Sequence, residues 1–399
     1  MFTDLIRKIG AAFYKAGLRK GQTVEFVIPN NSHYHTIVFG AWLCEAIVSL
    51  SDPEMSVPIL KNHLSETKAN FVICYEGSRS NVKNALEELG LIGKIKVILL
   101  ELACPKDSQD SSISEDDFLF FKGKYLIWFC YTISNKCLYS NTMIADFIKG
   151  SENYPPPASL QNGPLRDDET TIIFWSSGTT GIPKGIQHSV EYMKRYLYLF
   201  DKMKTRGPRK VPKITTTCFF HVGGFLSPFD LWSTVIFNSG SDLESEHCTE
   251  LLYKEINCFK PQTMVCGSHH LVQISQNPPL DDSLDLSSVL TVMPMGTRAP
   301  DQLYEDLKKN LKSLTHVNNY YSMSEICGVI TSSKDVKCLG AVYPGAIVKI
   351  VEPDTGKLCG VNEVLTLLLH KLAHFVKKTT MQLNSKAMMK FLTCRCQDK

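Results

Sequence analysis

The sequence predicts an α/β protein with parallel-rich sheets, and three observations support this fold class. Short apolar runs alternate with amphipathic stretches, a pattern typical of buried parallel strands connected by helices. The 399 residues, 44% of them hydrophobic, are ample for buried cores and too many for one ordinary domain. Beyond about residue 335, strand–turn–strand patterning replaces the alternation. We therefore expect two α/β subdomains, 1–150 and 151–334, and a small β-rich subdomain at 335–399.

The first predicted subdomain opens with an amphipathic helix in the stretch MFTDLIRKIGAAFYKAGL. This stretch lacks the charged start and apolar core of a signal peptide, while a weak targeting role stays open. The segments TVEFVIP, ANFVICY and KIKVILLE predict short strands, and HTIVFGAWLCEAIVSLS predicts a buried helix that runs into a strand. The longest strongly apolar run, LIWFCYTI at 126–133, is too short to span a bilayer and predicts another buried strand.

A polar, proline-rich segment, SENYPPPASLQNGPLRDDE at 151–169, predicts a linker between the α/β subdomains. A second series of strands is then predicted at TTIIFW, KITTTCFF, PQTMVCG and SVLTVMP. Further on, GAIVKIVEPDTGK predicts a strand and a turn at 354–356, followed by another strand.

Composition excludes several classes of function. Lys plus Arg is 43 and Asp plus Glu is 40, so nothing in the charge favours nucleic acid or an anionic membrane. The 14 cysteines show no CxxC spacing, which indicates free thiols in a reducing compartment. His370 and His374 have the spacing of a zinc-protease motif, but Lys371 stands where that motif needs glutamate, which argues against a zinc site.

The segment FWSSGTTGIPKG, at 174–185, follows a predicted strand, and we expect a helix to begin after it near Ser189. Its glycines leave backbone N–H groups free to point inward, and its hydroxyls and Lys184 add further donors, a combination that binds phosphate oxygens. It is not a Walker loop, because Gly185 follows Lys184 where that motif has Ser or Thr. Taken on composition alone, a solvated flexible loop is the alternative.

The stretch from Ser176 to Gly185 resembles the signature loop of the adenylate-forming, or AMP-binding, superfamily. That superfamily includes acyl-CoA synthetases, plant coumarate–CoA ligases and beetle luciferases, and its loop reads Ser-Ser/Gly-Gly-Thr-Thr-Gly-x-Pro-Lys-Gly. FFHVGGF resembles its acyl-pocket segment, NNYYSMSE its Gly-Tyr-Gly-x-Thr-Glu motif, MGTRAP its small-residue loop beside adenine, and DTGKLCGVNE a turn of its β-barrel subdomain. The resemblance runs from about residue 2 to about residue 392, and it implies two stacked α/β subdomains with parallel-rich sheets and a small partial β-barrel subdomain at 335–399.

The resemblance implies roles for individual residues. Lys184, His221 and Glu325 would be catalytic, and Glu325 would hold Mg²⁺, for which a carboxylate is a suitable hard ligand. Tyr321 would stack on adenine, which suits an aromatic face, and Ser324 would contact phosphate. The acyl pocket would include His221, Gly223 and Gly224. The implied ATP-binding residues are Ser176, Ser177, Gly178, Thr179, Thr180, Gly181, Lys184, Ala299, Asn319, Tyr320, Tyr321 and Ser324.

Each assignment has a simpler alternative. Glu325 is then a surface acid, His221 a buried histidine with satisfied hydrogen bonds, and Tyr321 a core residue. Three positions depart from the family pattern: Arg298 replaces a small residue, and Glu45 and Ser322 replace glycines.

The resemblance implies binding of ATP–Mg²⁺ and CoA, and activation of a fatty or aromatic carboxylic acid as its acyl-adenylate. The family's Thr-Gly-Asp motif and its small mobile C-terminal domain are absent from this sequence, and 364–380 departs from the expected barrel strands. We therefore expect an impaired thioester step. The alternatives are a non-catalytic nucleotide- or acyl-binding remnant and a luciferase-type monooxygenase. The resemblance implies a cytoplasmic or peroxisomal location, although the terminal QDK is not a peroxisomal signal.

Overall fold

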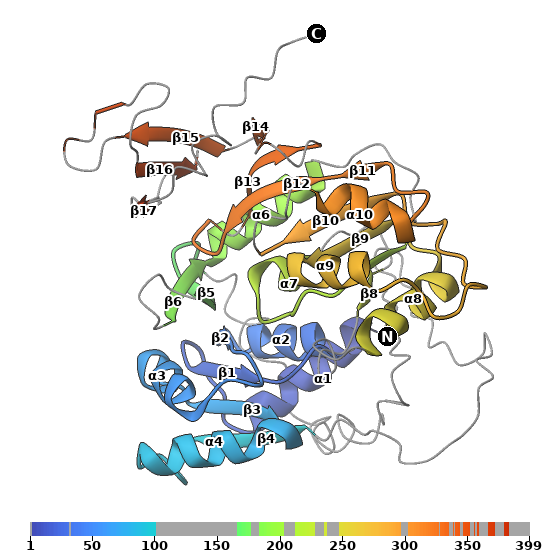
Figure 1. Ribbon diagram of the computed structural model, residues 1–399. Coiled ribbons are helices and arrows are strands. Elements are labelled where there is room, and N and C mark those ends of the chain that lie inside the picture. The colour runs from blue at the N-terminus through green and yellow to red at the C-terminus, as the bar shows by residue number, and fades with distance from the viewer. Residues whose placement is uncertain are drawn as a thin grey trace. The chain divides into compact units, whose positions relative to one another are not determined.

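The computed structural model divides into two compact units, Met1–Val211 with Thr215–Leu251 (unit 1), and Pro212–Ile214 with Leu252–Lys399 (unit 2) (Figure 1). The described residues are 2–31, 33–100, 166–176, 183–202, 212–227, 235–237, 247–296, 302–326, 328–334, 338, 340–343, 346–351, 355, 357–358, 366–371 and 379–382. The predicted strand at 126–133 and most of the predicted linker, 151–165, lie outside them. The predicted class, α/β with parallel-rich sheets, is confirmed.

Unit 1 contains a six-stranded sheet in the order β4-β3-β1-β2-β5-β6. Its neighbours pair in parallel except for β5 and β6, which are antiparallel. The sheet continues across the predicted subdomain boundary at 150, and the boundaries at 150 and 334 stay predictions. The strands are β1 (Thr23–Val27), β2 (Ile47–Leu50), β3 (Phe71–Tyr75), β4 (Lys96–Leu100), β5 (Thr170–Ser176) and β6 (Lys184–Ser189).

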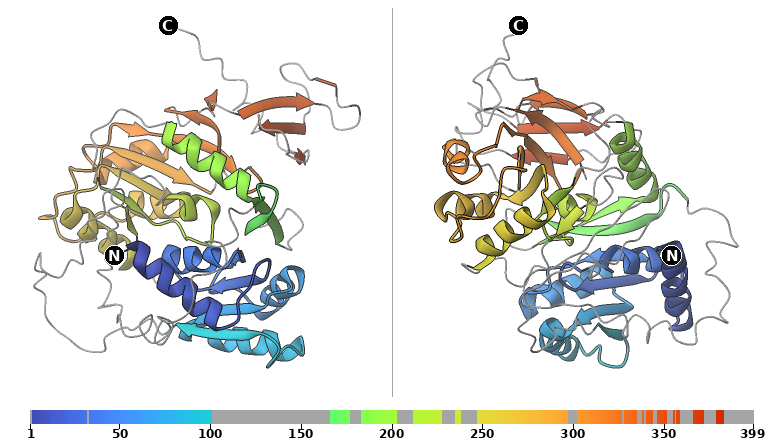
Figure 2. Two further views of the ribbon diagram at one scale, coloured as in Figure 1. Left: turned by 180° about the vertical axis from the view of Figure 1, so that it is seen from behind. Right: turned by 90° about the vertical axis from the view of Figure 1, so that its right-hand side faces the viewer.

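Four helices cover the strands β1 to β4, two on each face (Figures 1 and 2). They are α1 (Phe2–Lys15), α2 (Tyr34–Leu43), α3 (Val57–Thr67) and α4 (Glu76–Glu88). Strand residues alternate between the faces, so Phe26 lies 6.0 Å from the Tyr34 ring of α2, while Val27 packs with Leu60 of α3 and Val82 of α4. The helix α6 (Val190–Lys202), the short helix α7 (Val222–Leu226) and the strand β8 (Val235–Phe237) complete the described elements of unit 1.

The helices α1 and α2 approach each other closely because glycine faces glycine at their contact. A Cβ atom added to Gly40 would overlap the Ile9 side chain, and one added to Gly10 would lie 3.1 Å from Leu43.

None of the described helices is long and apolar enough to cross a membrane.

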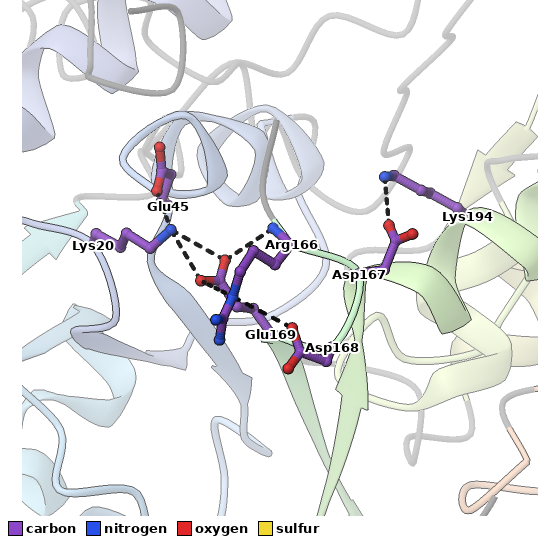
Figure 3. A network of polar contacts seen from close by, with 7 residues as sticks. All are labelled: Lys20, Glu45, Arg166, Asp167, Asp168, Glu169 and Lys194. Carbon is purple, nitrogen blue, oxygen red and sulfur yellow. Dashed lines mark hydrogen bonds and ion pairs between the residues drawn. The ribbon is translucent and has the colours of Figure 1, made fainter. Parts of the chain in front are cut away.

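A surface ion-pair network joins the segment before β5 to the loops that flank β1 and β2 (Figure 3). Lys20 Nζ lies 2.9 Å from Glu45 Oε2 and 3.0 Å from Glu169 Oε1, and Arg166 Nε lies 3.4 Å from the same Glu169 atom. Glu45 has a φ of 56°, in the left-handed region that favours glycine, which explains why a glycine is usual in the family at this position. The ion pair with Lys20 offsets the free-energy cost of burying the Glu45 carboxylate.

Unit 2 contains a sheet in which β11, β10, β9 and β7 follow one another, with β9, β10 and β11 paired in parallel. Two antiparallel sheets, β12-β13-β14 and β15-β16-β17, form the rest, and no closed barrel is present among the described strands. The sheet strands are β7 (Lys213–Thr215), β9 (Thr263–Gly267), β10 (Thr291–Met295) and β11 (His316–Val317), with helices α8 (His247–Phe259), α9 (Ser268–Gln276) and α10 (Leu303–Asn310). The antiparallel strands are β12 (Asn319–Met323), β13 (Gly328–Ser333), β14 (Ala341–Val342), β15 (Ala346–Val351), β16 (Thr366–Lys371) and β17 (Thr379–Gln382).

The described cysteines are free thiols, as predicted. They are Cys44, Cys74, Cys218, Cys258, Cys266 and Cys338.

Candidate functional site

The predicted phosphate loop connects β5 to β6 in an antiparallel hairpin, and its two ends are the paired residues Ser176 and Lys184. The predicted helix start near Ser189 is confirmed, because α6 begins at Val190, but the strand β6, which the sequence did not predict, lies between the loop and this helix. Pairing with β5 satisfies the backbone groups on one side of β6, and this gain outweighs the weak strand pattern of KGIQHS. Lys184 therefore does not lie at the N-terminus of a helix, where the helix dipole would favour a bound phosphate.

The described part of the loop presents one half-buried hydroxyl residue, Ser176, and one exposed amine, Lys184. Ser177, Gly178, Thr179, Thr180 and Gly181 lie outside the described residues. The roles of all these residues in holding phosphate stay predictions.

The strand β5 is anchored by Trp175, the residue that directly precedes the loop. Its Nε1–H donates to Ser49 Oγ on β2 at 2.9 Å, and its ring stacks on the His63 ring at 3.5 Å with only 3° between the planes. Gly185 on β6 lies against the same indole, since an added Cβ would approach its Cη2 atom to 3.2 Å. The ends of the loop therefore leave from a rigidly packed part of the sheet.

Behind Trp175 lies a buried polar cluster around Glu25, which has 0% exposure. The Glu25 carboxylate accepts hydrogen bonds from Ser49 at 3.0 Å, from Ser51, and from Thr67 at 3.3 Å. Burial raises the pKa of Glu25 to about 7, although these hydroxyl donors oppose the shift. While Glu25 is ionised, Ser51 donates to it, and the 2.7 Å bond between Ser51 Oγ and Nδ1 of His63 then places the hydrogen on Nδ1.

Burial lowers the pKa of His63 to about 3, so this ring is neutral. Among the described residues, its Nε2 atom has no hydrogen-bond partner. No sequence motif predicts this cluster, and the one signal for it is an acidic residue inside the apolar strand TVEFV.

The segment FFHVGGF contains the short helix α7, and His221 occupies its N-cap. The His221 side chain is exposed, which argues against the alternative of a buried core histidine, yet the surrounding protein lowers its pKa through desolvation. Gly223 is half-buried and Gly224 is buried. A Cβ atom on Gly224 would overlap the carbonyl oxygen of Cys218, so the close approach of these backbones requires glycine.

The stretch NNYYSMSE forms β12 and the turn after it, in unit 2. Asn319 is buried and its Nδ2 donates to the Cys338 carbonyl at 3.3 Å. Tyr320 packs edge-on against Tyr343 with ring centroids 6.5 Å apart, and burial raises the pKa of Tyr320 to about 12. A bulge between Tyr321 and Ser322 shifts the register with β13, a device that redirects side chains.

Tyr321 is half-buried and packs against the apolar pair Ile326 and Ile330. Burial is the main cause that raises the pKa of Tyr321, and the charge of Glu325 adds to this rise. The Tyr321 and Glu325 side chains therefore lie close enough to interact. Ser324 and Glu325 are half-buried in the turn that follows β12.

Glu325 fits a Mg²⁺ ligand on chemical grounds. It is a partly accessible carboxylate, and no cation of the described residues pairs with it. Three or more metal-ligating side chains do not gather anywhere in the described part of the chain, but Mg²⁺ bound to phosphates usually needs only one or two protein carboxylates. Arg298 and Ala299, like the turn residues Asp354 and Gly356, lie outside the described residues.

The chain belongs to the AMP-binding enzyme family, whose model matches residues 2–370. It is 24% identical over 375 residues to the probable 4-coumarate–CoA ligase 1 of Dictyostelium discoideum, covering 90% of this chain and 61% of that protein. It is 27% identical over 371 residues to the luciferin 4-monooxygenase of Photuris pensylvanica, covering 91% of this chain and 61% of that protein. The chain therefore spans about three-fifths of the length of these relatives.

Solved structures show the same fold. The luciferase-like enzyme of the nonluminescent mealworm Zophobas morio has a TM-score of 0.68 at 20% identity, covering 92% of this chain and 78% of that one. The anthranilate CoA ligase AuaEII, in complex with anthranoyl-AMP, has a TM-score of 0.69 at 17% identity, covering 93% of this chain and 64% of that one.

Proposed function

We propose that this chain binds ATP with Mg²⁺ and activates a fatty or aromatic carboxylic acid as its acyl-adenylate, with the thioester step to CoA impaired. The observation that supports this most is the signature loop from Ser176 to Gly185, which leaves β5 and returns on β6 in a chain of the AMP-binding family. The CoA ligases among the relatives and structural neighbours support the substrate class. A cytoplasmic or peroxisomal location belongs to the same proposal and depends on the family resemblance alone.

In this proposal, a carboxylate oxygen of the acid attacks the α-phosphorus of ATP, and pyrophosphate leaves with the electron pair of the broken P–O bond. Charge on the phosphates must be neutralised during this step. Lys184 and the glycine- and hydroxyl-rich loop, 176–181, would hold the phosphates. Mg²⁺ on Glu325 would supply further positive charge, and Ser324 would contact phosphate.

The remaining roles concern binding and orientation. The ring of Tyr321 would stack on adenine, with Asn319, Tyr320 and Ala299 beside the nucleotide. His221, Gly223 and Gly224 would line the acyl pocket, where the exposed imidazole of His221 can reach a bound acid.

The direct test measures pyrophosphate release from ATP with a panel of fatty and aromatic acids, and thioester formation with labelled CoA in a separate assay. Lys184→Ala should weaken ATP binding while thermal stability is unchanged, because an exposed lysine contributes little to folding. Lys94→Ala, which removes another exposed lysine of unit 1, is the matched control and should bind ATP as the parent does. Equal ATP affinity in Lys184→Ala and the parent, measured by calorimetry, would exclude the phosphate role.

The likeness to a luciferin 4-monooxygenase supports a second candidate, an oxygen-dependent luciferase-type reaction of the adenylate. Light emission with a luciferin panel under oxygen, and its loss under nitrogen, distinguishes this reaction from a ligase. ATP binding without acid-dependent pyrophosphate release would instead identify a non-catalytic nucleotide-binding protein.

A further inference from the structure

The acyl-motif segment, Thr215–Leu226 around His221, is held by two buried side chains from the β1–α2 region of unit 1. We propose that Asn30 and His35 are positioning residues that fix this segment, and that their hydrogen bonds set the affinity for the carboxylic acid without affecting that for ATP. The second half of this statement depends on the proposed function.

Asn30 holds the segment on both sides of Cys218. Its Nδ2 donates to the Thr217 carbonyl at 3.0 Å, and its Oδ1 accepts from the Phe219 N–H at 2.6 Å. Asn30 is 3% exposed, so water cannot replace these bonds at low cost. One side-chain amide therefore satisfies a donor and an acceptor of the segment together, as a neighbouring strand would.

His35 holds the other end of the segment. Its Nε2 lies 2.9 Å from the Phe225 carbonyl oxygen, and because that oxygen can only accept, Nε2 must carry the hydrogen. Burial lowers the pKa of His35 to about 4, so the ring is neutral near pH 7. The imidazole is also fixed by aromatic contacts, edge-on to Phe219 at 4.7 Å and stacked on Phe225 at 4.9 Å.

Backbone bonds carry this restraint to His221. The His221 N–H donates to the Cys218 carbonyl at 3.1 Å, inside the stretch that Asn30 holds. The Phe225 N–H donates to the His221 carbonyl at 2.8 Å, and Phe225 is the residue that His35 holds. His221 itself is exposed, so its place in the acyl pocket depends on residues that do not themselves contact a substrate.

The adjacent residue Asn31 supplies a matched control. It is 2% exposed, and its Nδ2 donates to the Pro29 carbonyl at 2.9 Å while its Oδ1 accepts from the His33 N–H at 3.0 Å. Both asparagines therefore bridge a backbone acceptor and a backbone donor, but these Asn31 bonds are local whereas those of Asn30 reach the acyl-motif segment. Asn→Asp removes the donor from either residue and keeps an acceptor.

Asn30→Asp should raise KM for the acid by about tenfold, because a carboxylate would face the Thr217 carbonyl. The dissociation constant for ATP should stay within about twofold of the parent value, since the two Asn30 bonds to Thr217 and Phe219 lie in the acyl-motif segment and not in the predicted phosphate loop. Asn31→Asp should leave both values at those of the parent. Equal rises of acid KM in the two variants would overturn the proposal.

The role of His35 is tested by its conservative variant. His35→Gln offers an amide N–H to the Phe225 carbonyl, whereas His35→Phe keeps an aromatic ring and removes the donor. Acid KM should rise in His35→Phe and be largely restored in His35→Gln. Acid KM at the parent value in a folded His35→Phe variant would contradict the role.

Two measurements need no substrate and separate this proposal from the proposed function. Hydrogen exchange of the His221 amide, which donates to the Cys218 carbonyl, and carbethoxylation of the His221 ring by diethyl pyrocarbonate should both be faster in Asn30→Asp and unchanged in Asn31→Asp. If the parent shows no acid-dependent pyrophosphate release, the proposed function fails while these rates still report on the positioning. Unchanged rates in Asn30→Asp would overturn the positioning itself, whatever the activity.

Discussion

At the scale of single residues, Glu25 is a carboxyl group buried within a sheet, and its pKa of about 7 has a consequence for stability. The folded chain retains a proton that the unfolded chain releases between about pH 4.5 and pH 7, so this residue destabilises the fold as pH rises through that window. Glu25→Gln cannot ionise and should lose this dependence. Relative to the parent, its free energy of unfolding should rise by up to about 3 kcal/mol between about pH 5 and pH 8.

Urea unfolding at several pH values measures this difference. Glu66→Gln, which changes an exposed acid on α3, the helix that carries His63 and Thr67 of the cluster, is the control and should run parallel to the parent at every pH. A constant difference between Glu25→Gln and the parent across the pH range would show that the buried carboxyl does not titrate in this window.

Glu325 allows a second test at residue scale. If Glu325 holds Mg²⁺ as proposed, Glu325→Gln should weaken ATP binding in Mg²⁺ more than ATP binding in EDTA. The reason is that a neutral amide is a poorer ligand for a hard cation than a carboxylate. Isothermal calorimetry in both conditions measures the two effects, with Glu305→Gln, an exposed acid on α10, as the control. An equal loss in both conditions would assign Glu325 a structural role.

At the scale of elements, α7 depends on one glycine. Gly224→Ala would press a Cβ atom into the Cys218 carbonyl, so α7 must move or the Cys218 turn must open. We expect a loss of about 1–3 kcal/mol in stability, the range for overpacking a tight site, together with weaker acid binding. Thermal melting and acid-dependent pyrophosphate release measure the two effects, and parental values for both would show that the segment accommodates a methyl group.

At the scale of the whole molecule, burial lowers the pKa values of three histidines of unit 1, His33 to about 4, His35 to about 4 and His63 to about 3. The unfolded chain binds protons at these residues below about pH 6.5, and the folded chain does not, so stability falls with pH from about 6.5 to about 4. Glu25 acts in the opposite direction, but it is one group against these three histidines and His221, whose pKa desolvation also lowers. We therefore expect net acid destabilisation of unit 1.

Tryptophan fluorescence can measure this acid destabilisation of unit 1. The 4 tryptophans of the chain all precede Leu252, so tryptophan fluorescence reports on unit 1, whereas far-UV circular dichroism reports on both units. Urea midpoints from fluorescence should fall between about pH 6.5 and pH 4, and more steeply in Glu25→Gln, which lacks the opposing group. Midpoints that do not change with pH would contradict neutral burial of these histidines.

Much of the fold could be predicted, because the buried strands TVEFV, FVICY and TTIIFW have strong apolar patterns and occur as β1, β3 and β5. The strand β6 could not, since KGIQHS alternates only weakly and forms through pairing with β5. The motif residues were found through family resemblance, while the cluster around Glu25 was not. Its members come from β1, β2, α3 and β5, so only the packed structure brings them together.

The hairpin of β5 and β6 also affects the conformational entropy that the predicted phosphate loop would lose on binding a ligand. Ser176 and Lys184 are paired across the ladder, so the entropy of bringing the ends of 177–183 together is lost when the chain folds. A ligand that binds between these ends has no loop closure left to drive, and more of its interaction energy appears as affinity. The same closure makes loop length a sensitive variable: one residue inserted into 177–183 leaves the pairing intact, whereas one inserted into β6 slips the register and turns Lys184 to the opposite face of the sheet.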